Sequence, residues 1–553
     1  MDKKLDSLTK EELINYIEEL RKQLNNEKYG LYFDRKATPE DIVEECKVKI
    51  PILERESILD INQEGIDHIL VEGDNFHVLS ALNMVDSQTG LVDLIYIDPP
   101  YNTGNKDFVY KDRFMSKDDG YFHTTWLNFM EKRLILARNL LKESGAILIS
   151  IDEHEFAQLK LLCDSVFGEK NFVEVFVYDK KSAPKGVPPK NMVASVHEYI
   201  LCYAKDNDKF SFVGIPRSKT GWSNPDNDPR GLWRNTNIKS TVSDKTYEVV
   251  DPSTGNTFVD TWACSEDTMK RYIEEGRIIF PKNKTGQVRI KEYYNEMTNP
   301  NIPIKTSLGL FDGQWNTEML NKLLNGKKFN NPKHLNLMKL IIGAAANSNA
   351  IIMDFFAGSG TTGHAVLELN KEDEGNRKFI LCTNNENNIM HNVCYPRLKT
   401  VITGEKIDGE YFGEKHKASL KYFKASFVED NVSKDQSKYN LVEKCDGLLN
   451  IKEQVYEKVG TGTNFNLYSN KENKCMGIYN NYFETTSFNE MLLKIKNLNM
   501  ANNIIYYFSL DNNIDENIEK KVRDIIPNSI VKPIPSKIYE IYKDISDNIR
   551  RMY

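Results

Sequence analysis

The stretch Leu91-Val92-Asp93-Leu94-Ile95-Tyr96-Ile97-Asp98-Pro99-Pro100-Tyr101-Asn102 decides how the chain is organised. Residues 91–97 form an apolar run rich in Ile, Val and Leu, which is typical of a buried strand in a parallel sheet. The run ends at two prolines, which have no N–H to donate to a β-ladder. Because ligands of open α/β sheets bind at the carboxyl ends of the strands, we expect residues 98–101 to lie at a binding site.

The residue types in Asp98-Pro99-Pro100-Tyr101 suit a target that carries an exocyclic amine. An ionised Asp98 accepts hydrogen bonds, and so does the Pro99 carbonyl, which has no competing N–H. Together they can take both hydrogens of an amine and leave its lone pair free. Tyr101 offers a flat face on which a base outside its duplex stack can lie. For so short a motif, a plain proline turn with a packing tyrosine is the alternative.

A second apolar strand, Ile351 to Asp354, leads into a glycine-containing turn at 355–360 and a predicted helix from Thr361 to Leu369. Glycines let the backbone approach a ligand closely, and a helix N-terminus presents free N–H groups.

These two elements together resemble the amino-methylating DNA methyltransferases that use S-adenosyl-L-methionine. The resemblance rests on Asp98-Pro99-Pro100-Tyr101 and on Asp354-x-Phe356-x-Gly358-x-Gly360. The tetrapeptide comes first and the glycine turn about 250 residues later, an order similar to that of the permuted β class. Three further short motifs resemble those in the modification subunits of type III restriction–modification systems. They are Gly73-Asp74-Asn75, Tyr101-Asn102-Thr103-Gly104-Asn105 and Ile149-Ser150-Ile151-Asp152-Glu153.

The resemblance implies a Rossmann-like α/β methyltransferase core that is circularly permuted, with an inserted target-recognition region and a small C-terminal α+β domain. Strands that alternate with helices between residues 69 and 167 agree with a parallel sheet. The predicted boundaries are an N-terminal helical segment at 1–50, the catalytic half of the core at 51–205, the recognition insertion at 206–329, the cofactor half at 330–403 and the C-terminal domain at 404–553.

The resemblance also assigns roles to single residues. The catalytic set is Asp98, Pro99, Pro100 and Tyr101, and the set for binding S-adenosyl-L-methionine is Asp74, Lys333, Asp354, Phe356, Gly358, Gly360 and Glu386, with no metal. Some of these have structural alternatives. Asp74 can serve as the N-cap of the following helix, and Lys333 can face solvent. For Glu386, the nearby Asn384 leaves open which position matches the acidic residue of the family.

The activity implied is methyl transfer from the cofactor to N6 of an adenine flipped out of double-stranded DNA. Cytosine N4 is the alternative substrate, since both are amines conjugated to a ring; the related cytosine enzymes more often have Ser before the prolines. An RNA or protein-glutamine methyltransferase is more remote. A DNA-binding assembly subunit with a degenerate site is the non-enzymatic alternative, and intact Asp98, Tyr101, Gly358 and Gly360 argue against it.

Composition bounds the remaining possibilities. The chain has 553 residues, 40% of them hydrophobic and 28% charged, which is ordinary for a soluble protein. No apolar run reaches membrane-spanning length. The eight cysteines show no metal-binding spacing and are expected to be reduced thiols. The expected location is the bacterial cytoplasm, with the protein associated with the nucleoid when it is bound to DNA. The expected partners are DNA, a second copy of the chain and a restriction (helicase–nuclease) subunit.

The net charge of −7 requires basic residues to cluster if the chain binds DNA. Two loops have such clusters, at 180–190 and 282–291, although solvated loops are the default interpretation. In the insertion, the residues available for phosphate or guanine contacts are Arg217, Lys219, Arg230, Arg234, Lys239 and Arg289. The capping box and apolar stripe of residues 9–25 predict a helix that docks on its own globule or forms a short coiled coil.

Overall fold

The computed structural model describes residues 31–35, 40–46, 48–84, 90–104, 109–110, 113–114, 121–181, 192–283, 285–429, 434–470, 472–481, 486–508 and 516–534. The chain divides into two compact units, the first formed by 1–213 and 305–553 and the second by 214–304. The predicted helix at 9–25 and most of the 180–190 loop lie outside the described residues.

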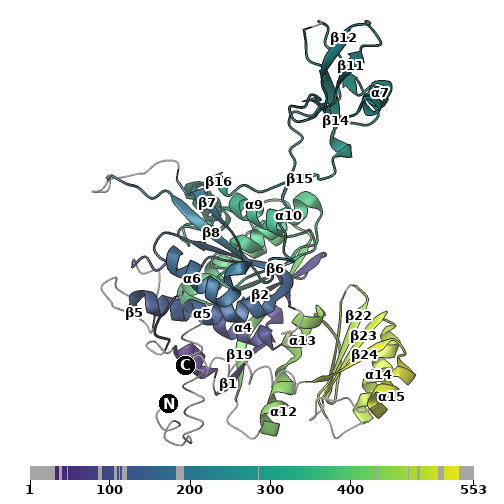
Figure 1. Ribbon diagram of the computed structural model, residues 1–553. Helices are drawn as coiled ribbons and strands as arrows, with labels where there is room; N and C mark the ends of the chain where they lie inside the picture. The colour runs from purple at the N-terminus through teal and green to yellow at the C-terminus, as the bar shows by residue number, and fades with distance from the viewer. Residues whose placement is uncertain are drawn as a thin grey trace, which may run out of the picture. The chain divides into compact units, whose positions relative to one another are not determined.

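A ten-stranded sheet forms the centre of the first unit within the described residues (Figure 1). Its order is β1 (Lys49–Arg55), β19 (Ala418–Glu429), β2 (Ile66–Glu72), β18 (Lys378–Thr383), β17 (Ile351–Asp354), β3 (Val92–Ile97), β6 (Leu141–Ile151), β8 (His197–Ala204), β7 (Phe172–Asp179) and β16 (Ser307–Leu310).

The strands from β19 to β6 in this order all run parallel. The outer strands are mixed, because β1 and β8 are antiparallel to their inner neighbours. The apolar run that opened the sequence analysis forms β3, and all but one of the residues of this strand are buried. A strand buried on both faces has no polar side to show to water, which explains why its sequence does not alternate.

Two layers of helices cover the sheet (Figure 1). One comprises α4 (Asn75–Asn83), α5 (Phe122–Leu140) and α6 (Phe156–Phe167), and the other comprises α9 (Leu335–Ala345), α10 (Thr361–Asp373) and α11 (Tyr395–Thr403). Ile380 and Cys382 of β18 share a core with α4, α5 and α6. The intervening Leu381 lies on the opposite face, where an added Cβ at Gly363 of α10 would come within 2.8 Å of it. Because adjacent strand residues point to opposite faces, the sheet lies between the two layers. The predicted α/β fold class is confirmed.

Short elements complete the core. They are α3 (Asp41–Glu45), η1 (Ser57–Leu59), β4 (Val109–Tyr110), β5 (Arg113–Phe114), η2 (Glu169–Asn171), α8 (Gly313–Leu323), η4 (Glu386–Asn388) and η5 (Met390–Cys394).

The second unit, residues 214–304, has its own small core. Its elements are β9 (Ile215–Pro216), β10 (Trp233–Asn237), β11 (Thr246–Val250), β12 (Thr257–Thr261), α7 (Glu266–Glu274), β13 (Ile278–Ile279), β14 (Arg289–Tyr293), η3 (Tyr294–Glu296) and β15 (Asn301–Ile302). Trp262 is fully buried there, against Val249, Phe258 and Met269. This unit falls inside the predicted insertion at 206–329 but is shorter, since β16 and α8 belong to the first unit.

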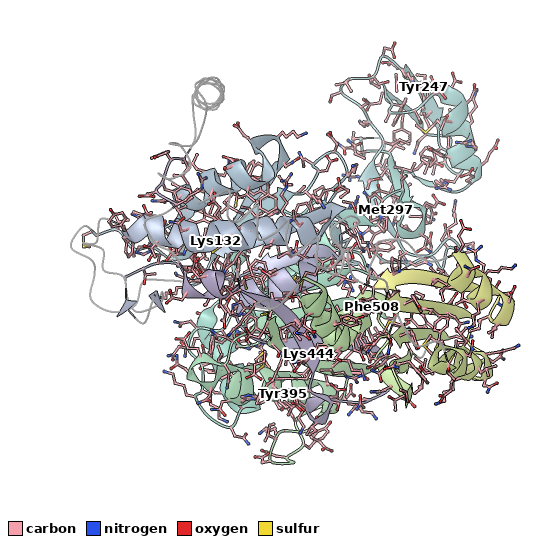
Figure 2. The ribbon with its side chains drawn as sticks, turned by 90° about the horizontal axis from the view of Figure 1, so that it is seen from below. Lys132, Tyr247, Met297, Tyr395, Lys444 and Phe508 are labelled. Atoms are coloured by element: carbon pink, nitrogen blue, oxygen red, sulfur yellow. The ribbon has the colours of Figure 1, made fainter. Side chains whose placement is uncertain are left out.

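A five-stranded sheet follows near the C-terminus. Its elements are α12 (Lys434–Lys444), α13 (Asp446–Glu453), β20 (Glu457–Gly462), β21 (Phe465–Ser469), β22 (Lys474–Tyr479), α14 (Thr486–Leu498), β23 (Asn502–Phe508), α15 (Glu516–Ile525) and β24 (Ser529–Ile534). Tyr479 packs with α14 and α15 on one face, whereas Ile478 and Phe508 (Figure 2) pack with α12 and α13 on the other.

The predicted boundary between residues 403 and 404 differs from the structure. β19 lies beyond this boundary but pairs with β2 and β1 in the central sheet. A strand buried in the core therefore follows the cofactor half directly, and the separate five-stranded sheet starts only after it. Sequence did not reveal this because residues 420–427, which mix apolar residues with lysines, do not specify which sheet the strand joins.

Candidate active site

The turns that carry the predicted site residues lie along one edge of the central sheet. β17 and β3 are parallel neighbours, with Ile352 opposite Leu94 and Met353 opposite Ile95. Asp98 and Gly358, which follow these two strands, therefore emerge side by side. The turns after β18 and β2 continue the row.

Hydrogen bonds between these turns tie the edge together. The Ala357 N–H donates to the Cys382 carbonyl (3.1 Å), and the Gly73 N–H donates to the Thr383 carbonyl (3.1 Å). The Asn75 side chain donates to the Phe355 carbonyl (3.2 Å). The glycine turn is thus held against its neighbours on both strands.

Hydrogen bonds hold the backbone of the tetrapeptide in place on both sides of Tyr101. The indole N–H of Trp126, a fully buried residue of α5, donates to the Pro100 carbonyl at 2.7 Å. Asn102 is buried with a positive φ of 57°, and its amide donates to Glu155 Oε1 at 2.5 Å. These contacts fix the backbone on either side of Tyr101, while the Asp98 side chain stays 30% exposed and can reach a ligand.

A lysine ammonium lies at the centre of the polar groups around the tetrapeptide. Lys333 Nζ is 3.2 Å from Asp98 Oδ1 and 2.7 Å from Glu198 Oε2. It also donates to the Tyr101 hydroxyl and lies 4.9 Å from the centre of that ring. The Tyr101 and Tyr178 hydroxyls both donate to Glu198 Oε2, the former at 3.2 Å. Two carboxylates, one ammonium and two phenols therefore form one network.

Burial and charge set the ionisation of this network. Burial raises the pKa of Asp98, and the charge of Glu198 adds to the rise, while Lys333 opposes it. Burial also acts to raise the pKa of Glu198, but Lys333 and Lys180 outweigh it and hold this pKa at about 2. The pKa of Lys333 stays well above its usual value because Asp98 and Glu198 outweigh the effect of burial. Glu198 and Lys333 are thus firmly charged, and Asp98 is the carboxylate more easily protonated.

The glycine turn follows β17 in a shape that its glycines allow. Gly358 and Gly360 have φ values of 50° and 76°, in the left-handed region that other residues avoid. Asp354 Oδ1 accepts from the Phe356 N–H (2.9 Å), and Oδ2 accepts from the Thr362 hydroxyl (2.5 Å). Because Asp354 is buried, its pKa is raised to about 7. Its carboxylate shapes the turn, whereas Phe356 and Gly358 are half-buried and open to a ligand.

The two acids expected farther along the edge differ in exposure. Asp74 caps α4 by accepting from the Phe76 N–H at 2.7 Å, so the N-cap interpretation is confirmed. The guanidinium of the buried Arg133 lies 3.6 Å from the Asp74 carboxylate. Glu386 is exposed in η4, just after β18. Their place at the same edge leaves both available to a ligand, and their cofactor roles stay predictions.

Comparison with known proteins identifies the family. Residues 92–393 match the model of the N6/N4 DNA methylases, described as DNA methylase. The chain belongs to the DNA methylase family. The matched segment contains the tetrapeptide, Lys333 and the glycine turn.

Two relatives are similar to this chain over more than half of its length. The type III restriction-modification enzyme StyLTI Mod subunit of Salmonella typhimurium is 33% identical over 61% of this chain and 55% of that protein. The type II methyltransferase M.KpnI of Klebsiella pneumoniae is 35% identical over 57% of this chain and 79% of that protein. The alignment thus spans about half of the StyLTI Mod subunit. The solved structure of the PvuII DNA methyltransferase (cytosine-N4-specific) has a TM-score of 0.32 and 12% identity, over 71% of this chain and 96% of that one.

The structure adds residues to the site that the sequence analysis did not select. Glu198, Tyr178 and Lys180 reach the tetrapeptide from β8 and from the end of β7. One signal was available: Glu198 is an acid inside β8, most of whose residues are buried. The Nε2 atom of the neighbouring His197 lies 2.8 Å from the Tyr199 hydroxyl.

Lys333 was assigned to cofactor binding by the resemblance. In the part of the chain that the structure describes, its ammonium contacts Asp98 and Tyr101 of the tetrapeptide, and its cofactor role stays a prediction. Among the described residues, the group of side chains close enough to share a metal ion is Asp152, Glu153 and His154, after β6. His154 Nδ1 already lies 3.0 Å from both Asp152 oxygens, and we assign no metal to it.

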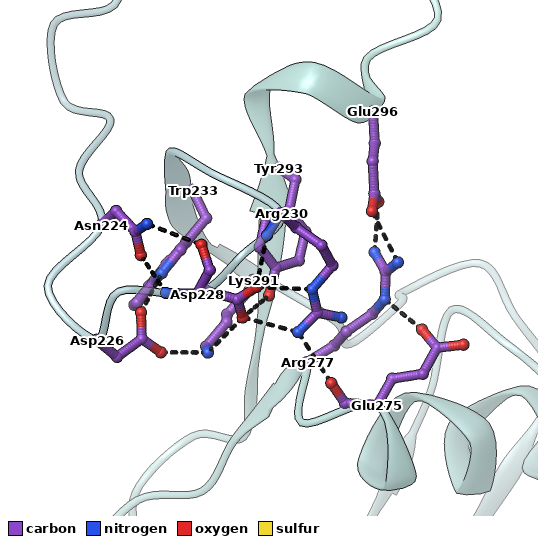
Figure 3. A network of polar contacts seen from close by, with 10 residues as sticks. All are labelled: Asn224, Asp226, Asp228, Arg230, Trp233, Glu275, Arg277, Lys291, Tyr293 and Glu296. Atoms are coloured by element: carbon purple, nitrogen blue, oxygen red, sulfur yellow. Dashed lines mark hydrogen bonds and ion pairs between the residues drawn. The ribbon is translucent and has the colours of Figure 1, made fainter.

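Within the second unit, basic residues form a dense ion-pair network (Figure 3). Asp228 accepts from Nε and Nη2 of Arg230 (2.8 and 2.7 Å) and from the Tyr293 hydroxyl (2.6 Å). These hydrogen bonds, those of Arg230 first, lower the pKa of Asp228. Arg234 pairs with Glu292, and Lys239 with Asp260. Three of the six residues predicted to contact DNA are therefore engaged in holding this unit together.

Among the described residues, no helix is both long and apolar enough to cross a membrane.

Proposed function

We propose that this chain is a site-specific DNA methyltransferase that methylates N6 of adenine in double-stranded DNA, with S-adenosyl-L-methionine as the methyl donor. The observation that carries the proposal is the position of Asp98 and the glycine turn at the ends of neighbouring parallel strands, in a chain of the DNA methylase family. An acceptor for an amine and a loop suited to a cofactor are then within reach of one another.

The tetrapeptide would hold the target base. Flipping a base costs a few kcal/mol in lost stacking and pairing, and stacking on Tyr101 would return roughly 1–3 kcal/mol. Asp98 and the Pro99 carbonyl would accept the two N6 hydrogens and so favour a pyramidal nitrogen with an available lone pair. Positioning and electrostatics, without a covalent enzyme intermediate, account for the rate increase.

The edge of the sheet fits the cofactor. Gly358 is accessible and has a φ of 50°, a conformation that favours glycine, and without a Cβ this face of the turn stays open to a ligand. Phe356 would pack against the cofactor, and Asp74 and Glu386 would accept hydrogen bonds from its adenosine part. When bound, S-adenosyl-L-methionine supplies an electrophilic methyl group. Asp354, already occupied by Thr362 and the Phe356 N–H, would keep the turn in shape.

The biological setting follows from the relatives. A Mod subunit of a type III system is among them, and we infer the same role here, as a homodimer on DNA in the bacterial cytoplasm with a separate restriction subunit as partner. A cytosine-N4 methyltransferase is the alternative.

The experiment is transfer of labelled methyl from S-adenosyl-L-methionine to DNA, with nucleoside digestion and mass detection of the product. We expect N6-methyladenine from the wild type. Asp98→Ala should abolish transfer and leave cofactor binding near normal. Asp208→Ala, which removes an exposed carboxylate outside the site, serves as the control. Label in cytosine would refute the adenine assignment, and an Asp98→Ala variant with more than a few per cent of the wild-type rate would refute the role of Asp98.

A further inference from the structure

The candidate site contains a second carboxylate that the proposed chemistry does not use. Glu198 lies on β8, two strands away from β3, and is 9% exposed. Its Oε2 accepts from Lys333, Tyr101 and Tyr178, and its Oε1 accepts from Lys180 at 3.0 Å. A buried carboxylate with this many donors is firmly fixed.

We propose that Glu198 is a positioning residue for methyl transfer, which holds the Lys333 ammonium so that Asp98 can exchange it for the amine of the target base. The proposal rests on the methyltransferase function proposed above. Glu198 would act through Lys333 and would not touch the base.

The first argument concerns competition for Asp98. An ammonium and an exocyclic amine are both N–H donors, and in this structure Lys333 already lies 3.2 Å from Asp98 Oδ1. A bound amine must displace it. A buried ammonium that loses its partner is strongly unfavourable, but Lys333 keeps a closer partner in Glu198 at 2.7 Å. Glu198 therefore lets Lys333 withdraw without becoming an unpaired charge.

The second argument concerns charge. As the N6–carbon bond forms, the carbon–sulfur bond breaks and its electron pair stays on sulfur, so positive charge moves to N6 until an N6 proton leaves to Asp98 or water. Lys333, a cation beside Asp98, opposes this charge. Glu198 offsets Lys333 with one negative charge at close range. Without that offset, the field of Lys333 at N6 would raise the barrier.

The test compares pH–rate profiles of the full-length enzyme, wild type and variants, on the same DNA. The charged and titratable groups that face Asp98 are Lys333, Glu198, Tyr101, Tyr178, Tyr96 and Asp354. Asp98 must be ionised to accept the amine, so its pKa sets the acid limb of kcat. Glu198→Gln removes a charge that raises this pKa, and the acid limb should move to lower pH. Lys333→Met removes a charge that lowers it, and the limb should move to higher pH.

At the alkaline plateau, Glu198→Gln should lower kcat by about 20- to 100-fold. This is the effect of the uncompensated Lys333 charge at a distance of roughly 6–9 Å from N6, with an effective dielectric constant of about 20. Glu198→Asp keeps the charge and should retain the wild-type acid limb at a reduced kcat, which provides a better tolerated second variant. Glu174→Gln on the neighbouring strand β7 removes a carboxylate outside the network and is the matched control.

Opposite displacements of the acid limb in Glu198→Gln and Lys333→Met would support the proposal. The proposal is overturned if the acid limbs of the two variants move in the same direction or do not move. It is also overturned if Glu198→Asp behaves like Glu198→Gln. Loss of packing alone would lower kcat without moving the acid limb of the pH–rate profile. Absence of transfer by the wild type and by Glu174→Gln would refute the proposed function itself. If the wild type transfers methyl but the acid limb does not move in the variants, only the positioning role of Glu198 is overturned.

Discussion

The buried carboxyl of Asp354 should make the stability of the protein depend on pH between about 4 and 7. Its side chain is 2% exposed, and its pKa is raised to about 7 from an ordinary 3.8. Burial is the main cause, and the Thr362 hydroxyl and the Phe356 N–H reduce the rise only partly. The magnitude follows directly, since each pKa unit corresponds to about 1.4 kcal/mol and the difference of about three units gives roughly 4 kcal/mol.

The direction follows from which state holds the proton. Below pH 4 the carboxyl of Asp354 is protonated in the folded and the unfolded chain, and its contribution to stability is fully present. Between pH 4 and 7 the unfolded chain loses this proton while the folded protein keeps it, so the folded state loses stability as the pH rises. Above pH 7 both states are ionised and the loss is constant.

Asp354→Asn removes this ionisation. In urea unfolding followed by tryptophan fluorescence, the free energy of unfolding of the variant relative to wild type should increase by roughly 4 kcal/mol from pH 4 to pH 7. Altered hydrogen bonding of the amide adds the same amount at every pH and does not affect this comparison. Thr362→Val removes the hydroxyl that lowers the pKa of Asp354 and should extend the wild-type loss to higher pH. If the difference between Asp354→Asn and wild type is the same at pH 4 and pH 8, the carboxyl does not titrate as described.

Three further substitutions test the site. Tyr101→Ala should weaken binding of DNA that carries a fluorescent base at the target position by roughly 1–3 kcal/mol, and Tyr101→Phe should weaken it much less. Equal losses of binding free energy in the two variants would show that the hydroxyl matters and the ring face does not. Gly360→Ala should lower the free energy of unfolding by about 1–2 kcal/mol, because φ is 76° and the new Cβ would lie 3.1 Å from Cys394 Sγ; an unchanged value would contradict the strain. Trp126→Phe should cost about 1–3 kcal/mol in urea unfolding, since the Pro100 carbonyl loses its donor; a stability equal to wild type would show that this bond does not anchor the turn.

Local sequence determined the strands and turns of the core. The apolar run before Asp98 and the one before the glycine turn had no polar face, so each could be stable only as a buried strand with its polar groups at its end. Glycine at positions 358 and 360 allows the left-handed φ values that the turn adopts there. The hydrogen-bonding capacity of the tetrapeptide was also predictable, because an ionised acid and a proline carbonyl both accept hydrogen bonds; its catalytic role stays a prediction.

Only the tertiary structure decided which side chains surround that tetrapeptide. Lys333 and Glu198 are 135 residues apart, and nothing local in either segment indicates that they share a hydrogen bond, since sheet order and not sequence distance brings β8 and the residue before α9 together. The membership of β19 in the central sheet was undetermined for the same reason. A strand's own residues specify that it is buried, but the neighbour that buries it is selected by packing across the whole molecule.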